Sequence, residues 1–233
     1  MTDTVLDLSP APVMTPRPLL IGSPAPRFST RTTMGDRSLD DYRGRWLVFF
    51  SHPADFTPVC TSEFVAFSKL YPEFRKLDCD LLALSVDSLF SHIAWVRSIK
   101  ERFGVSVPFP IAEDPSMAVA AAYGMIHPDA RDASTVRATF VVDPEGIIRA
   151  MVWYPMSTGR SVGEILRLVQ ALQTCDKEAA STPEGWHLGD DLIEPAPLTI
   201  EEAAADAAPG ADAPDWYYRV KKSRDQQWNS KQS

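Results

Sequence analysis

Residues 51–64 combine a cysteine with residue types that make a thiol reactive. The apolar run 46–50 before this stretch predicts a buried strand, and the amphipathic pattern after it predicts a helix that begins near Thr61. Cys60 therefore lies where a loop enters the first turn of a helix. Unpaired backbone N–H groups and the helix dipole favour an anion there, and helix N-termini lower the pKa of cysteine thiols. The sequence thus predicts a nucleophilic thiolate at Cys60.

The loop before Cys60 supports this interpretation. Pro53 and Pro58 stiffen the loop and remove two N–H donors. Thr57, three residues before Cys60, brings a hydroxyl near the sulfur. The alternative is a buried cysteine that packs as a small apolar residue. The proline-rich turn, Thr57 and the helix start together favour the reactive cysteine.

The spacing Pro53-x-x-x-Thr57-x-x-Cys60 resembles the active-site signature of the peroxiredoxins. The longer run 52–60 is most similar to the one-cysteine subfamily, and the order of elements extends the resemblance over about residues 19–222. It implies a thioredoxin-like α/β fold with a C-terminal dimerisation arm. It also implies a thiol-dependent peroxidase that reduces hydrogen peroxide and organic hydroperoxides through a sulfenic acid at Cys60, without a cofactor or metal.

The resemblance further implies an arginine network around the sulfur. Arg137 matches the arginine that lies beside the reactive cysteine in peroxiredoxins, where it would stabilise the thiolate and the transition state. Glu63 matches the glutamate that holds this arginine, and Arg160 matches a second arginine of the network. The residues alone leave alternatives open. Arg137 would otherwise be a solvent-facing residue at a strand end, and Glu63 and Arg160 would be surface charges of little energetic consequence.

Three loop residues complete the predicted site. The thiolate must attack one peroxide oxygen while the other leaves, so the O–O bond has to be oriented and the departing charge stabilised. Thr57 Oγ and the backbone N–H groups at the helix start are candidates for this work. By resemblance, Pro53 screens the sulfur from over-oxidation and His52 lies near the pocket, although a lone histidine is more often structural.

The remaining cysteines bear on how the sulfenic acid is reduced. Two-cysteine relatives carry a resolving cysteine in the C-terminal region, whereas the run 216–219 here, Trp-Tyr-Tyr-Arg, has none. Cys79 precedes a predicted strand and Cys175 ends a predicted helix, so both are most simply structural. The sequence therefore predicts resolution by an external thiol, such as thioredoxin or glutathione.

Two other functions compete with the peroxidase. A general thiol–disulfide oxidoreductase would require C-x-x-C at the helix start, and residue 57 is threonine. An oligomeric chaperone or redox-sensing module that uses the same cysteine is the other alternative. The acidic C-terminal segment with its aromatic residues permits this function, which could coexist with catalysis. Cys60-dependent consumption of peroxide separates these functions from the peroxidase.

Composition divides the chain into three parts. Residues 1–18 predict an extended or disordered lead-in, and 19–175 predict the thioredoxin-like domain. Residues 176–233 predict an arm that is acidic as far as residue 215 and basic after it, with Trp216 to Tyr218 between the two regions. Aromatic side chains seek burial, so this arm packs either on its own domain or on a partner subunit. The resemblance favours packing on a partner subunit, and therefore predicts a homodimer or a larger oligomer.

Element patterns within the domain predict α/β structure. Strands are expected over 46–50, 81–86, 136–142 and 147–153. Pro72 predicts a kink or break in the helix after Cys60. Asp114 predicts an N-cap. Ser88 predicts the N-cap of a helix whose apolar face consists of Leu89, Ile93, Val96, Ile99 and Phe103.

Overall composition narrows the environment. A hydrophobic content of 45% and a charged content of 23% are typical of a soluble globular protein. The formal net charge of −8 argues against nucleic-acid partners and anionic membrane surfaces. Three cysteines without C-x-x-C favour a reducing cytoplasm. The four histidines are dispersed along the chain and predict no metal cluster.

Overall fold

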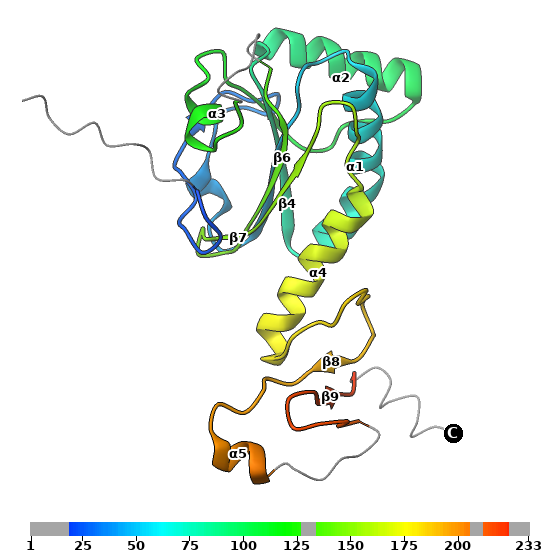
Figure 1. The fold of residues 1–233 in the computed structure, drawn as a ribbon. Coiled ribbons are helices and arrows are strands. Elements are labelled where there is room, and N and C mark those ends of the chain that lie inside the picture. Colours follow the sequence, from blue (N-terminus) through cyan, green and yellow to red (C-terminus); the bar gives the residue numbers. More distant parts are fainter. Residues whose placement is uncertain (1–18, 127–133, 206–211, 224–233) are drawn as a thin grey trace, which may run out of the picture.

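The computed structural model describes residues 19–126, 134–205 and 212–223, so the predicted lead-in 1–18 lies outside the described residues. Its centre is a sheet in the order β5-β4-β3-β6-β7 (Figure 1). The parallel part consists of β3 (Trp46–Ser51), β4 (Cys79–Ser85) and β5 (Ile111–Glu113). The antiparallel part is formed by β6 (Arg137–Val142), which pairs with β3, and β7 (Ile148–Tyr154). The predicted mixed α/β class is confirmed.

Helices and short strand pairs surround this sheet. The helices are α1 (Pro58–Lys76), α2 (Leu89–Phe103), α3 (Ala118–Ala122), α4 (Val162–Glu178) and α5 (Ile200–Ala205). A 3-10 helix spans Leu39–Tyr42. The short pairs are β1 (Ser29–Thr30) with β2 (Arg37–Ser38), and β8 (Leu192–Ile193) with β9 (Val220–Lys221).

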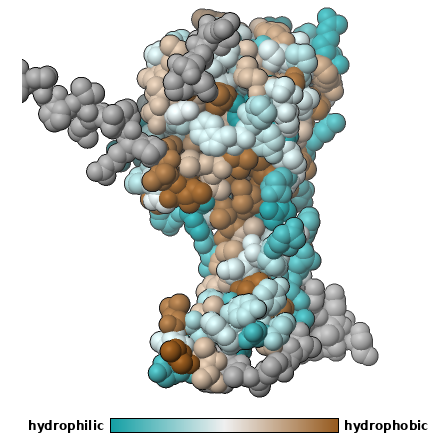
Figure 2. Space-filling model, in the orientation of Figure 1, coloured by the Kyte–Doolittle hydropathy of each residue, from teal (hydrophilic) through white to brown (hydrophobic). Residues whose placement is uncertain are grey.

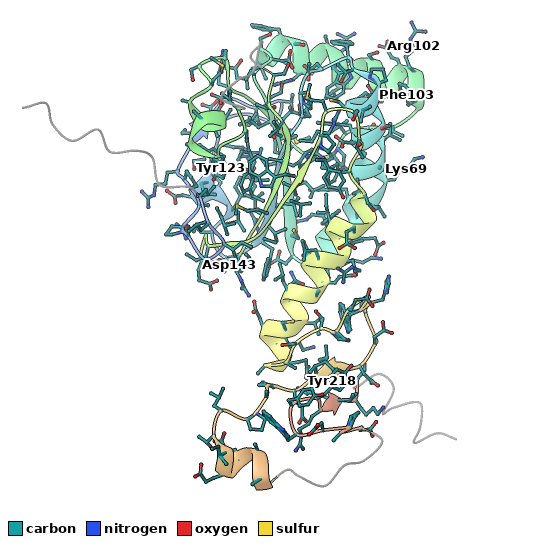
Figure 3. The ribbon with its side chains drawn as sticks, in the orientation of Figure 1. Lys69, Arg102, Phe103, Tyr123, Asp143 and Tyr218 are labelled. Carbon is teal, nitrogen blue, oxygen red and sulfur yellow. The ribbon has the colours of Figure 1, made fainter. Side chains whose placement is uncertain are left out.

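The two faces of the sheet carry separate cores because side chains alternate along each strand. Val48 and Phe50 of β3 face the core formed with α1, α2 and α4. Phe49 faces a second core that contains Tyr123. Figure 3 shows Tyr123 and Lys69 of α1 on opposite sides of the sheet. Every residue of β3 is buried, so the strand that leads to Cys60 is held rigidly.

The start of α1 lies earlier than predicted. Thr57 has the extended conformation of an N-cap and Pro58 occupies the first helical position, which suits its fixed φ. Cys60 is therefore the third residue of the helix. The helix also continues through Pro72 to Lys76, so no break occurs there. Pro72 lies near the end of α1, where phenylalanines packed between the helix and the sheet hold both sides of it.

The predicted N-cap of α2, Ser88, is confirmed, but the buried face of the helix differs from the prediction. Ser88 Oγ accepts a hydrogen bond from Ser91 N at 3.3 Å, and Gly104 ends the helix with φ of 68°. The buried residues are His92, Trp95 and Ile99. Ile93 and Phe103, predicted to be on the apolar face, are exposed. A polar side chain, His92, thus takes a core position that the hydrophobic pattern had missed.

Asp114 does not cap α3. Met117, with φ of 60°, precedes the helix instead, and Asp114 Oδ2 accepts a hydrogen bond from Ala120 N at 2.7 Å. The chain turns between Asp114 and Met117 before the helix begins, since Met117 N donates to Asp114 O at 2.9 Å. The predicted N-cap is therefore wrong, while its carboxylate still serves a backbone N–H of the helix.

The described part of the C-terminal arm leaves the domain at the end of α4 (Figure 1). That helix runs to Glu178, three residues beyond the boundary predicted at 175. Trp186 packs with Ala171 of α4 and with Leu192, and Lys221 Nζ donates to Glu178 O at 2.7 Å. The first part of the arm therefore packs on its own domain.

The far end of the arm presents apolar side chains to solvent. Ile200, the first residue of α5, is 84% exposed, and Leu198, two residues before it, is 93% exposed. Figure 2 shows brown, hydrophobic surface at this end of the arm. Trp216, Tyr217 and Tyr218 are also exposed.

The cap of α2 provides a test of the local structure. Ser88→Ala removes the acceptor for Ser91 N, and we expect it to lower the free energy of unfolding by about 1 kcal/mol. Urea unfolding followed by circular dichroism measures this change. Ser98→Ala, within the same helix, is the control and should leave stability nearly unchanged. Equal effects of the two substitutions would contradict the capping assignment.

Candidate active site

Cys60 is fully buried in the first turn of α1. The hydrogen bond from Thr61 N to Thr57 O, at 2.9 Å, is the first that the helix ladder provides, so the N–H groups of Val59 and Cys60 precede it. The positive end of the helix dipole therefore meets the sulfur. The predicted position of the cysteine at a helix start is confirmed.

Arg137, the first residue of β6, lies against the sulfur. Its Nη1 is 3.3 Å from Cys60 Sγ and 3.0 Å from Glu63 Oε2. Its Nε and Nη2 donate to Met156 O at 3.1 and 3.0 Å. The residue is only 3% exposed, so the alternative of a solvent-facing strand end is wrong. These contacts fix the guanidinium from both sides.

Glu63 joins Arg137 to Arg160. Glu63 Oε1 accepts hydrogen bonds from Arg160 N and Nε at 2.7 and 3.0 Å, and Oε2 accepts from Arg160 Nη2 at 2.6 Å. Arg160 Nη1 continues to Ala138 O at 3.1 Å, and its guanidinium lies over the Phe50 ring at 5.0 Å. All the charged groups are buried, so the surface-charge alternative is wrong.

The charges of Arg137, Arg160 and Glu63 do not sum to zero. Two guanidinium groups face one carboxylate in a site shielded from water, which leaves one excess positive charge. Burying an uncompensated charge is costly. Arg137 Nη1 lies 3.3 Å from Cys60 Sγ, so this excess positive charge is placed directly beside the sulfur.

Glu63 is held as a carboxylate by its partners. Burial by itself raises the pKa of Glu63, but hydrogen bonds from Arg160 and the charges of both arginines outweigh burial and lower the pKa below its ordinary value. The anion that orients Arg137 therefore persists at neutral pH.

The loop residues predicted for the site lie between β3 and α1. Pro53 is buried, and Thr57 Oγ1 donates to Ala54 O at 2.9 Å. His52 is fully buried, with Nε2 2.9 Å from Asp55 Oδ1, and its ring stacks on Trp95 at 5.2 Å between centroids. The structure brings Cys60 and Arg137 into direct contact, whereas His52 is directed to Asp55.

Sequence reasoning missed Asp55, within this loop, and His92, on the neighbouring helix α2. Asp55 Oδ2 lies 2.8 Å from His92 Nδ1, so one carboxylate bridges His52 and His92. The three side chains are buried, and their arrangement is one that could hold a metal ion. Distance along the sequence does not separate these two histidines, because the fold joins positions that lie 40 residues apart. His127 lies outside the described residues.

The chain is similar in sequence to proteins of one known family. Residues 21–151 match the AhpC/TSA family. The chain belongs to the peroxiredoxins of this family. The peroxiredoxin of Aquifex aeolicus is 51% identical, over 87% of this chain and 96% of that protein. The peroxiredoxin of Thermotoga maritima is 48% identical, over 87% and 97%. The chain is thus a thiol-dependent peroxidase, an antioxidant oxidoreductase acting on hydroperoxides with a thiol reductant.

Solved structures establish the fold of this peroxiredoxin. A yeast mitochondrial 1-Cys peroxiredoxin aligns with a TM-score of 0.77 at 42% identity, covering 88% of this chain and all of that one, 100%. A mutant of peroxiredoxin 6 from Arenicola marina aligns with a TM-score of 0.77 at 32% identity, covering 88% and 98%. The predicted thioredoxin-like fold is confirmed. Among the described residues, none of the helices is both long and apolar enough to cross a bilayer.

The buried carboxylate gives the peroxiredoxin a specific pH dependence. The ionised form of Glu63 stabilises the fold fully above its ordinary pKa of 4.5, and this stabilisation is lost as the pH falls through the lower folded value. We expect Glu63→Gln to lower the free energy of unfolding by about 3–5 kcal/mol at pH 7. The difference from the wild type should shrink below pH 4.5.

Urea unfolding at a series of pH values measures this dependence. Glu164→Gln is the matched control, because Glu164 is also paired with an arginine, Arg167, but on the surface. We expect it to cost well under 1 kcal/mol at any pH. A Glu63→Gln effect as small as that of Glu164→Gln would contradict the buried network.

Proposed function

We propose that this peroxiredoxin is a one-cysteine enzyme in which Cys60 alone performs the protein's redox chemistry. The thiolate attacks one oxygen of the hydroperoxide, the O–O bond breaks, and the other oxygen takes a proton and leaves as water or an alcohol. Cys60 then carries a sulfenic acid. The observation that carries this proposal is the 3.3 Å contact between Arg137 Nη1 and Cys60 Sγ within a network of excess positive charge.

Arg137 stabilises both the thiolate and the charge that develops on the departing oxygen. Its distance from the sulfur allows Nη1 to face an oxygen bonded there. Glu63 and Arg160 act as positioning residues, since Glu63 holds Arg137 and Arg160 holds Glu63, and neither touches the sulfur in any described contact. A preorganised cation requires little reorganisation during the reaction.

Thr57 orients the peroxide. Because its hydroxyl hydrogen is donated to Ala54 O, the lone pairs of Oγ1 remain to accept the hydrogen of the substrate's O–H group. The N–H of Cys60 supplies a donor from the helix start. Pro53, buried in the same loop, screens the sulfur from further oxidation, and His52 supports the loop from within.

An external thiol completes the cycle. Burial raises the pKa of Cys79 to about 12, so this side chain stays a neutral thiol and is a poor nucleophile. Cys175 lies on α4, with Sγ 4.0 Å from Thr182 Oγ1. One thiol attacks the sulfenic acid and releases water, and a second thiol releases Cys60 as the disulfide forms. The yeast relative is described with glutathione/thioredoxin systems, and we propose a reductant of that class in a reducing cytoplasm.

The one-cysteine cycle makes a clear prediction for the three cysteines. Cys60→Ser should abolish peroxide consumption in the presence of dithiothreitol, because no other thiolate is held at the site. Cys79→Ser and Cys175→Ser should retain turnover within about twofold, since buried or peripheral thiols rarely affect distant chemistry. Peroxide consumption is followed with each purified variant. Loss of turnover in either of the latter two, while Cys60 still forms a sulfenic acid, would contradict external resolution.

We also propose that the arm joins two copies into a homodimer. The exposed apolar side chains at its end, Leu198 and Ile200, have no cover within the described chain, and burial against a partner removes them from water. Packing of Trp186 on α4 fixes the base of the arm and so directs its end away from the domain.

Charge placed on this surface tests the dimer. Leu198→Asp with Ile200→Asp should weaken association at least tenfold, because each charge would be buried without a partner. Sedimentation velocity over a range of concentrations measures the change. Leu188→Asp, at another exposed apolar position, is the control and should leave association unchanged. A monomeric wild type would contradict the proposal.

A further inference from the structure

A buried carboxylate lies between two buried imidazoles on the inner side of the loop that carries Thr57. Asp55 Oδ1 is 2.9 Å from His52 Nε2, and Asp55 Oδ2 is 2.8 Å from His92 Nδ1. Both imidazoles are fully buried. His52 belongs to the loop itself, whereas His92 belongs to α2. The carboxylate therefore ties the loop to a helix of the scaffold.

The same loop is anchored at further points. His52 N donates to Leu84 O at 3.0 Å, and its carbonyl accepts from Thr135 Oγ1 at 2.8 Å. Asp55 N donates to Asp87 Oδ2 at 3.0 Å. The next residue, Phe56, has φ of 57°, a left-handed conformation that a bulky residue adopts only where its surroundings impose it. The anchors around Asp55 supply that constraint, immediately before Thr57.

The protonation of the cluster follows from its charges. Burial raises the pKa of Asp55, but hydrogen bonds from His52 and His92 outweigh it and bring the pKa below its ordinary value. Burial also lowers the pKa of His52, so this imidazole is neutral. An ionised Asp55 only accepts hydrogen bonds, so each nitrogen that faces it carries a hydrogen. His52 therefore donates from Nε2 and His92 from Nδ1.

We infer that Asp55 and His92 are positioning residues of the peroxidase reaction, which hold the loop and the His52 tautomer so that Thr57 and Cys60 keep their productive geometry. This inference rests on the function proposed above for Cys60 and Thr57. Asp55 holds the imidazole of His52, and His92 in turn holds the carboxylate of Asp55. The loop is therefore oriented only when both hydrogen bonds are present.

Packing alone does not account for the cluster. His52 Nδ1 and His92 Nε2 have no hydrogen-bond partner among the described residues, and burying unpartnered polar atoms costs free energy. Apolar side chains of similar size would fill the same space without that cost. A metal ion is the other occupant that these ligands could accept, but it would have to displace both hydrogen bonds to Asp55.

The first test removes the bridging charge. In Asp55→Asn the amide offers one acceptor and one donor, so one imidazole must change tautomer or lose its hydrogen bond. We expect the second-order rate constant for oxidation of Cys60 by hydrogen peroxide to fall on the order of 10²-fold, the effect of a displacement of about 1 Å in a reacting group. Stopped-flow fluorescence measures the rate constant, with Trp95 stacked on His52 as the probe.

The second test depends on which imidazole nitrogen makes the hydrogen bond to Asp55, Nε2 in His52 and Nδ1 in His92. The amide nitrogen of asparagine overlays imidazole Nδ1, and that of glutamine overlays Nε2. His92→Asn should therefore keep most of the wild-type rate constant, while His92→Gln loses it. The order reverses at the other imidazole: His52→Gln should be faster than His52→Asn. A role in packing alone would follow side-chain size and give the same order at both positions.

Asp143→Asn is the matched control. Asp143 is a buried carboxylate that accepts from Ile147 N in the turn between β6 and β7, outside the loop and outside the site. It should lower thermal stability and leave the rate constant of the folded enzyme unchanged. Wild type and Cys60→Ser are measured first, because inactivity of the wild type would refute the peroxidase itself rather than the positioning role.

Three results would overturn the inference while leaving the peroxidase intact. One is a folded Asp55→Asn enzyme with the wild-type rate constant. Another is the same order of asparagine and glutamine at both histidines. The third is a wild-type rate constant that falls with EDTA and returns with zinc chloride, which would make the cluster a metal site.

Discussion

The carboxylate of Glu63, buried between two guanidinium groups, is the interaction on which the site depends. It comes from α1, Arg137 comes from β6, and Arg160 comes from the segment before α4, so one side chain fixes three parts of the chain to each other. Gly159 permits this closeness, since a Cβ there would meet Val59 Cγ1 at 3.3 Å. The backbone N–H of Arg160 can then reach the carboxylate.

The fold explains why this charge network meets a cysteine. In α/β proteins, ligands commonly bind at the carboxyl ends of the parallel strands, where the loop after each strand leads into a helix. Here the buried β3 delivers Cys60 to α1, while the antiparallel β6 brings Arg137 from the adjacent strand. Helix dipole and guanidinium act on the same sulfur, which lies away from water.

Much of this arrangement was readable in the sequence where the signal is local. The strand before Cys60, the cap at Ser88 and the hairpin between β6 and β7 depend on neighbouring residues. The spacing of Pro53, Thr57 and Cys60 carried the family resemblance. His92 escaped detection, because hydrophobic periodicity favours Ile93 and gives no reason to bury a histidine. The hydrogen bond from Arg137 to the carbonyl of Met156 could not be predicted either, because every residue has a backbone carbonyl and no side-chain pattern distinguishes this one.

We propose that Glu63 acts on Cys60 only through Arg137. A double-mutant cycle on the second-order rate constant for Cys60 oxidation tests it, with Glu63→Gln, Arg137→Met and the double variant. Each single substitution should slow oxidation, and the double variant should be no slower than Arg137→Met, because without the guanidinium the carboxylate has nothing to orient. Losses that multiply in the double variant would contradict this account, since Glu63 would then act on the sulfur independently of Arg137.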